Sequence, residues 1–253
     1  MIEIEKAKKE LVNHVHKLAI HNPRVEIKIG HIMRVAENCK KIANSLGLTE
    51  KEIELAELIG LLHDIGRFEQ YQIKEQDTIK KFDHGEAGVE VLKKDNYIRE
   101  YITEDTYDDI IYTAIYEHNK YELTKGMSKE KELFSKIIKD ADKLDLLYEA
   151  NEIYWQEAER IQKVEEGILS EKMLQEFYQH KLTNIKNRVS ETDQILRFAS
   201  FIFDIHFVYS FKTLQENNHV GKMIDRFHYQ VPETKEQMMK VKEVVNEYIN
   251  NKV

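Results

Sequence analysis

The sequence has few of the residues that make tight turns or cross-links. Its 253 residues include only 9 glycines and 2 prolines, and Cys39 is the single cysteine. Because β-sandwiches and β-barrels need many tight turns, the scarcity of glycine and proline disfavours both folds. One cysteine excludes a disulfide framework and a zinc site built from thiolates. The sequence therefore predicts an all-α fold in a reducing compartment.

A surplus of positive charge and a long hydrophobic run are also missing. The chain has 38 lysines and arginines against 46 aspartates and glutamates, which gives a formal net charge of −8. Since nucleic acid polymers are bound by clustered positive charge, we expect no such partner. The most hydrophobic window, Ile195 to Phe211, contains charged residues and falls short of the roughly 20 residues that cross a bilayer. The first residues show no targeting pattern, and we expect a cytoplasmic protein without a membrane partner.

Apolar residues recur at spacings of three and four over most of the chain, which indicates amphipathic helices. Helices are expected at about residues 5–20, 27–46, 53–66, 85–94, 107–118 and 128–165, with three or four more after residue 169 and one of those starting at Pro232. Gly47 is expected to close the second helix. The expected N-caps are Thr49 (with Glu52), Asp83 (with Glu86), Thr106 (with Asp109) and Ser128. We therefore expect one α-helical domain over residues 1–253, with a core at about 27–148 and a helical extension at about 149–253.

The expected helix that ends near Gly66 is apolar almost all round, which indicates that it is buried in the middle of a bundle. His63 and Asp64 lie at its end, where an ionisable pair is costly unless something compensates it. A bound divalent cation would compensate both side chains at once. Other histidines and aspartates lie near the ends of other helices or on the helix in IIKDADKLD: His31, His84, His118, Asp140, Asp142 and Asp145.

Five short motifs in this order resemble those of a known family. They are HIMRV at 31, LLHDIGR at 61, DHGEAG at 83, EHN at 117 and KDADKLD at 139. The chain resembles the HD-domain metal-dependent phosphohydrolases, and its order of histidines and aspartates resembles the subgroup that holds two metal ions. The resemblance covers roughly Ile27 to Tyr148 and implies an HD-domain helical bundle followed by a C-terminal helical extension.

The resemblance implies a set of six metal ligands. His31, His63, Asp64 and Asp142 would hold a first ion, and Asp64 would bridge to a second ion held by His84 and His118. Helical spacing alone does not choose among the aspartates at 140, 142 and 145, and the match of ADKLD to the last family motif selects Asp142. Imidazole and carboxylate ligands favour divalent transition metals, iron or manganese ahead of nickel or zinc.

The same resemblance implies a reaction and a substrate class. Asp64 and Arg67 would take part in catalysis, with a metal-bridged hydroxide as nucleophile and the Arg67 fork on a phosphate group. Weaker candidates for phosphate binding are Arg34, Lys80, Lys81 and Lys143. The substrate would be a small phosphate ester or anhydride, in the first place a nucleotide. The motifs are most similar to those of small HD proteins that hydrolyse dinucleoside tetraphosphates.

Two other functions remain open at this point. The same six ligands occur in di-iron HD-domain oxygenases, which use oxygen to cleave C–C or C–P bonds. A non-catalytic sensor that binds a nucleotide through a retained site is the second alternative. The extension could cover the site, form a homodimer surface or complete the core.

Overall fold

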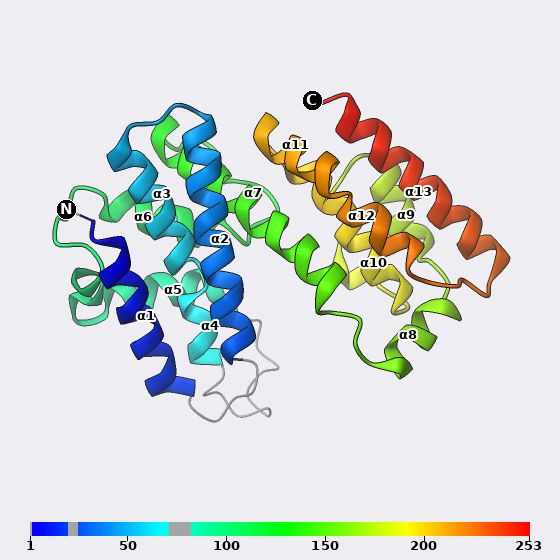
Figure 1. The fold of residues 1–253 in the computed structure, drawn as a ribbon, viewed down its shortest axis with the longest axis horizontal. Helices are drawn as coiled ribbons and strands as arrows, with labels where there is room; N and C mark the ends of the chain where they lie inside the picture. Colours follow the sequence, from blue (N-terminus) through cyan, green and yellow to red (C-terminus); the bar gives the residue numbers. More distant parts are fainter. Residues whose placement is uncertain (1, 20–24, 71–81) are drawn as a thin grey trace. The chain divides into compact units, whose positions relative to one another are not determined.

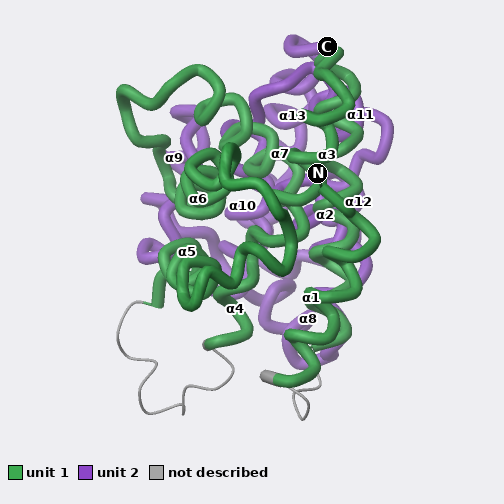
Figure 2. The backbone as a smooth tube through the Cα atoms, turned by 90° about the vertical axis from the view of Figure 1, so that its left-hand side faces the viewer, with its two compact units in different colours: residues 1–142 green, residues 143–253 purple. Residues whose placement is uncertain are grey.

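The computed structural model describes residues 2–19, 25–70 and 82–253, and Figure 1 shows their helices. The chain divides into two compact units, residues 1–142 and residues 143–253, which Figure 2 shows in green and purple. The described residues form helices and turns, with one isolated bridge between Ile2 and Ile102. The predicted all-α fold is confirmed.

The first unit is a bundle around one helix, α3, that is buried over most of its length. It is built from α1 (Ile4–Ala19), α2 (Val25–Ser45), α3 (Glu50–Leu62), α4 (Ile65–Gln70), α5 (His84–Lys93), η2 (Lys94–Glu100), α6 (Asp108–Glu117) and the first part of α7 (Lys129–Glu152). α2 and α3 lie side by side, α1 packs against both, and α5 contacts α4 and α6 (Figure 1). Every residue of α3 from Leu55 to Leu62 is buried, as its all-round apolar pattern predicted.

Several predicted helix ends are confirmed by backbone geometry. Gly47, after α2, has a φ of +69°, the left-handed conformation that glycine adopts without strain. The backbone N–H of Thr49 donates to Glu52 Oε2 at 2.7 Å, and the Glu52 N–H donates to Thr49 Oγ1 at 3.4 Å, which closes the capping box of α3. Asp83 caps α5, and Ser128 Oγ accepts the N–H of Lys131 at the start of α7.

Other predicted boundaries are wrong for local reasons. α6 begins at Asp108 with Tyr107 as its N-cap, because Thr106 belongs to the preceding turn and makes no cap. The helix predicted over 128–165 is broken after Glu152, where the chain turns and buries Trp155. The proposed helix end at Gly66 is also wrong, since a short helix, α4, already begins at Ile65.

The second unit holds more helices than the three or four expected after residue 169. It contains α8 (Ala158–Glu165), α9 (Glu171–Tyr178), η3 (Ile185–Asn187), α10 (Thr192–Ser200), η4 (Phe201–Asp204), α11 (Val208–Asn217), α12 (His219–Asp225) and α13 (Pro232–Asn250). Helix α10 contacts α8, α9, α12 and α13. Pro232 is at the first position of α13, as predicted. The sequence underestimated the number because most helices after residue 169 are short and the turns between them contain no glycine or proline.

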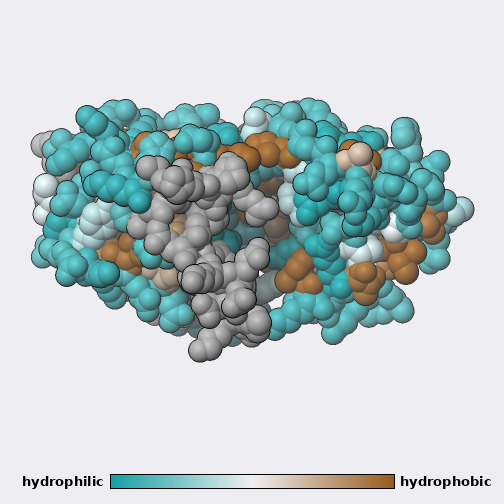
Figure 3. Space-filling view, turned by 90° about the horizontal axis from the view of Figure 1, so that it is seen from below, coloured by the Kyte–Doolittle hydropathy of each residue, from teal (hydrophilic) through white to brown (hydrophobic). Residues whose placement is uncertain are grey.

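Hydrophilic residues cover most of the face shown in Figure 3, and hydrophobic residues appear there in small groups. In the described part of the chain, none of the helices combines the length and the apolar character that crossing a bilayer requires.

Candidate metal centre

The His63–Asp64 pair lies in the turn between α3 and α4. His63 is the C-cap of α3, and α4 begins at the next residue after Asp64. Both side chains are buried, because the preceding turn of α3 is packed on all sides. The sequence expected this pair at the end of a buried helix, and the structure places it there.

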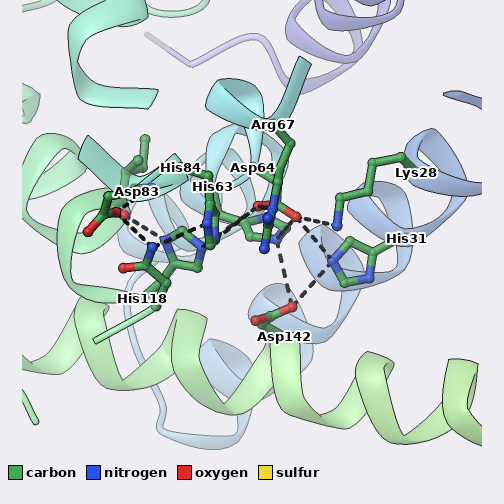
Figure 4. Close-up of polar contacts among 12 residues, drawn as sticks. Lys28, His31, His63, Asp64, Arg67, Asp83, His84, His118 and Asp142 are labelled. Atoms are coloured by element: carbon green, nitrogen blue, oxygen red, sulfur yellow. Dashed lines mark hydrogen bonds and ion pairs between the residues drawn. The ribbon is translucent and has the colours of Figure 1, made fainter. Parts of the chain in front are cut away.

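The two carboxylate oxygens of Asp64 face two different pairs of histidines. Oδ2 lies 3.6 Å from Nε2 of His31 and 3.4 Å from Nε2 of His63. Oδ1 lies 3.5 Å from Nε2 of His84 and 3.8 Å from Nε2 of His118. Figure 4 shows Asp64 in the middle, with His31 on one side and His84 and His118 on the other. One carboxylate therefore joins two clusters of possible ligand atoms.

Asp142, on α7, completes the first cluster. Its Oδ1 lies 3.3 Å from Nε2 of His31 and 3.8 Å from Nε2 of His63. His31 comes from α2 and is fully buried. In the second cluster, the Nε2 atoms of His84 and His118 are 3.1 Å apart. The structure thus brings together all six residues that the resemblance named.

Backbone carbonyl groups orient two of the imidazole rings. Nδ1 of His63 lies 2.7 Å from the carbonyl oxygen of Gly60, and Nδ1 of His118 lies 2.6 Å from that of Ile115. Because a carbonyl oxygen can only accept, both Nδ1 atoms carry the proton and donate it. With Nδ1 as the donor, Nε2 is the ring nitrogen that remains to bind a metal, which is the orientation that metal-ligating histidines require.

The cluster also fits a cation by its unsatisfied polar atoms. Within the described residues, the buried Nε2 of His63 and Oδ1 of Asp64 make no hydrogen bond of ordinary geometry. Buried polar atoms without hydrogen bonds are rare in native proteins and call for an explanation such as an ion. Two groups, His31–His63–Asp64 and Asp64–His84–His118, each have ligand atoms within 4.8 Å of one another. The donor set of imidazoles and carboxylates suits divalent transition metals.

The protonation states of these groups also suit metal binding. Burial lowers the pKa of His63, and it lowers the pKa of His84 to about 3. Burial opposes the charge of Asp64, but the positive charge of Lys28 holds the pKa of Asp64 well below its ordinary value. The pKa of Asp142 is also lowered, because hydrogen bonding and charge from His31 outweigh its burial. Near neutral pH the two histidines are neutral and the two carboxylates are charged, and these are the forms that bind metals.

A comparison with protein-family models supports this geometry. Residues 29–147 match the model described as "HD domain". The chain contains an HD domain. No curated protein and no solved structure matched the chain in the corresponding comparisons. HD domains are all-α folds that bind divalent metals and belong to the metal-dependent phosphohydrolase superfamily, in which some members are not catalytic.

The HD domain brings Asp64 and His84 together through a direct contact between backbones. A Cβ atom on Gly66 would lie 2.4 Å from the amide nitrogen of Gly88 and 2.4 Å from the carbonyl oxygen of His84. These distances exclude any side chain at position 66 unless α4 and α5 move apart. The glycine after the HD pair is therefore needed for close packing of the two helices.

Lys28, one residue before the matched range, is a residue beside Asp64 that the sequence reasoning missed. Its ammonium group forms an ion pair with Oδ2 of Asp64, and its side chain is 19% exposed. Burial opposes its charge, but the attraction of Asp64 raises the pKa of Lys28. Lys28 lies three residues before His31 on α2, so the two share a helix face. This spacing of three residues from a predicted ligand could have identified Lys28 from the sequence.

Arg67, the predicted phosphate-binding residue, also lies beside Asp64. Its Nε is 3.5 Å from Asp64 Oδ1, and its side chain is 37% exposed. Lys143, a weaker candidate, forms an ion pair with Asp204 at 2.7 Å within the second unit. Lys80 and Lys81 lie outside the described residues. Arg67 and Lys28 thus provide two cations beside the aspartate that joins the clusters.

Proposed function

We propose that the HD domain holds two divalent transition metal ions and hydrolyses a small phosphate ester or anhydride, in the first place a nucleotide. His31, His63, Asp64 and Asp142 would hold one ion, and Asp64, His84 and His118 the other. Iron and manganese are the first candidates, followed by nickel and zinc.

The position of Asp64 is the observation that carries the proposal. Each of its oxygens faces a separate pair of imidazole nitrogens, at 3.4–3.6 Å on one side and 3.5–3.8 Å on the other. A carboxylate can bridge two cations that are about 3.5–4 Å apart. Two ions bound there would lower the pKa of a bound water and polarise a phosphoryl group.

The chain's own residues favour an anionic substrate. Lys28 and Arg67 place positive charge on the two sides of Asp64, and Arg67 is exposed enough to reach a ligand in solvent. A guanidinium group can hold two phosphate oxygens at once, whereas an ammonium group acts as a point charge. We therefore assign phosphate binding to Arg67, supported by Lys28.

The test is hydrolysis of a panel of nucleotides and dinucleoside polyphosphates, followed by chromatography of the nucleotide products and by phosphate release, with protein reconstituted in Mn²⁺ or Fe²⁺ under anaerobic conditions. The wild-type chain should form hydrolysis products without oxygen. His63→Ala and Asp64→Ala should lose bound metal and activity while the circular dichroism spectrum stays helical. Turnover that requires oxygen would favour the oxygenase, and tight nucleotide binding without turnover would favour a sensor. Unchanged activity in either variant would contradict the site.

A further inference from the structure

Asp83 contacts two segments that carry histidines of the second cluster. It precedes His84, and its Oδ1 accepts the N–H groups of Gly85 at 3.0 Å and Glu86 at 3.2 Å, which caps α5. The same oxygen accepts a hydrogen bond from Nδ2 of Asn119 at 2.8 Å. Asn119 directly follows His118. One carboxylate thus links the start of α5 to the end of α6.

The other oxygen of Asp83 strengthens this link. Lys120 forms an ion pair with Oδ2 of Asp83. The ammonium group of Lys120 also lies 4.2 Å from the centre of the Tyr116 ring on α6. Its backbone is held in turn, because the buried Lys139 on α7 donates to the carbonyl oxygen of Lys120 at 2.5 Å. Asp83 is therefore attached to a segment that is itself anchored.

The backbones of α5 and α6 approach closely at this point. A Cβ atom on Gly85 would lie 2.9 Å from the carbonyl oxygen of Ile115 and 3.0 Å from that of Tyr116. The imidazoles of His84 and His118 meet across this contact with their Nε2 atoms 3.1 Å apart. Because the two rings come from different helices, their separation depends on what holds the helix ends together. The contacts of Asp83 with Asn119 and Lys120 are placed to do this.

We propose that Asp83 is a positioning residue that, through Asn119 and Lys120, sets the affinity of the second metal position at His84 and His118. The inference rests on the proposed two-metal centre and adds a residue that controls one half of it. The other cluster draws its remaining ligands from α2, α3 and α7, away from the start of α5. Loss of the Asp83 contacts should therefore weaken one position selectively.

The test separates the role of Asp83 as the N-cap of α5 from its contact with Lys120. In Asp83→Ser the hydroxyl can still cap α5, because serine is a good N-cap, but it cannot form the ion pair with Lys120. Asp83→Ala removes both functions. Asp109→Ser is the matched control. Asp109 lies on α6 at the opposite end from His118, and the substitution removes its ion pair with Lys131 of α7. The probe is Mn²⁺ alone, measured by equilibrium dialysis with metal analysis of the full chain.

Wild-type chain and Asp109→Ser should bind two ions. Asp83→Ser and Asp83→Ala should bind the second ion about 10- to 100-fold more weakly, with the first affinity changed by less than about twofold. Lys120→Met should have a similar effect. The double variant Asp83→Ser with Lys120→Met should bind the second ion little more weakly than either single variant, because both substitutions remove the same ion pair. If Asp83→Ala does not fold, Asp83→Ser and Lys120→Met still carry the test.

The outcomes distinguish this inference from the proposed function. A wild-type chain that binds a single ion would overturn the two-metal proposal and the role of Asp83 with it. A wild-type chain that binds two ions, with both affinities unchanged in Asp83→Ser, would overturn the positioning role alone and leave Asp83 a helix cap. Equal loss of both ions in Asp83→Ser would also overturn it, because the effect would then be general.

Discussion

Among single residues, Lys28 and Asp64 show how a charge pair can serve two purposes. The ammonium group of Lys28 stabilises the ionised form of a carboxylate that is 4% exposed, and it adds positive charge where a phosphate would bind. The positive charge of Lys28 acts in opposite directions on a metal ion and on a phosphate substrate. It repels a metal ion bound near Asp64 and attracts an anion.

Lys28→Met should therefore separate metal affinity from substrate affinity. We expect the Kd for Mn²⁺ to fall by about tenfold and the KM for the phosphate substrate to rise by about tenfold, since a unit charge at this range is worth more than 1 kcal/mol. Dialysis and steady-state kinetics measure the two values. Lys28→Arg retains the charge and should change both less. A fall in KM in Lys28→Met would contradict the assignment.

Asp193 is the residue with the clearest structural role in the second unit. Its fully buried carboxylate accepts N–H groups from Ser170 at 2.7 Å, Val189 at 2.7 Å and Ser190 at 3.2 Å. It therefore ties the start of α9 and the turn before α10 to α10 itself.

Asp193→Ala should lower the free energy of unfolding of the second unit by about 3 kcal/mol, because it leaves buried N–H groups without acceptors. Trp155, the single tryptophan, is buried in this unit, so urea unfolding can be followed by its fluorescence. Asp225→Ala is the control, since that carboxylate is half exposed and, among the described residues, forms its ion pair with Lys242 at the surface. Equal stability of both variants would contradict the role of Asp193.

At the level of helices, glycine determines how closely α4 and α5 pack. Gly66→Ala should force these helices apart and move Asp64 away from His84. We expect loss of the second Mn²⁺ and a stability loss of about 1–3 kcal/mol, measured by dialysis and thermal unfolding. Gly30→Ala is the matched control, because a Cβ there would meet only the end of the Arg34 side chain, at 3.2 Å. Retention of two ions in Gly66→Ala would show that the contact can relax.

The helices were predictable wherever local chemistry decides them. The apolar pattern identified α3 as buried, and Thr49 and Asp83 marked the starts of α3 and α5. The break after Glu152 was not predictable, because it depends on burial of Trp155 against Phe227, with ring centroids 5.2 Å apart. Such contacts join residues that are distant in sequence.

The site was predictable in composition but not in its supporting contacts. All six proposed ligands were named from motifs, and the structure places their side chains close together. Lys28 lies outside the motifs, and for Asp83 the motifs indicated capping alone. Both roles depend on three-dimensional neighbours, Asp64 in one case and Asn119 with Lys120 in the other.

For the whole molecule, the net charge of −8 does not describe the local charge at the candidate site. The surplus of acidic side chains describes the surface, and it argues against polyanionic partners. The metal centre is a local exception, since Lys28, Arg67 and bound cations would make it positive. A small phosphate is therefore compatible with an acidic protein.

The buried histidines predict an acid-sensitive HD domain when metal is removed by a chelator. His84 has an ordinary pKa of about 6.5 when unfolded and about 3 when folded, and the pKa of His63 is also lowered. The unfolded chain therefore binds more protons below pH 6.5, so stability is complete above that pH and falls as the pH drops towards 3.

We expect a slope of up to about 1.4 kcal/mol per pH unit for each histidine. Hydrogen exchange of peptides from residues 29–142, recorded from pH 7 to pH 5 and corrected for the intrinsic rate, measures it. His84→Gln should reduce this slope by the contribution of one histidine, about 1.4 kcal/mol per pH unit. Stability that rises towards pH 5 would contradict the neutral state of these rings.

The backbone contact between Gly66 and Gly88 also limits how this centre can vary. Side chains can adopt other rotamers when a neighbour changes, but two peptide backbones in contact cannot. The spacing between the two halves of the centre is therefore a property of the chain path and not of any side chain. Substitution of ligands can alter metal preference at a fixed spacing, whereas a wider or narrower centre would need an insertion or deletion around the α4–α5 contact.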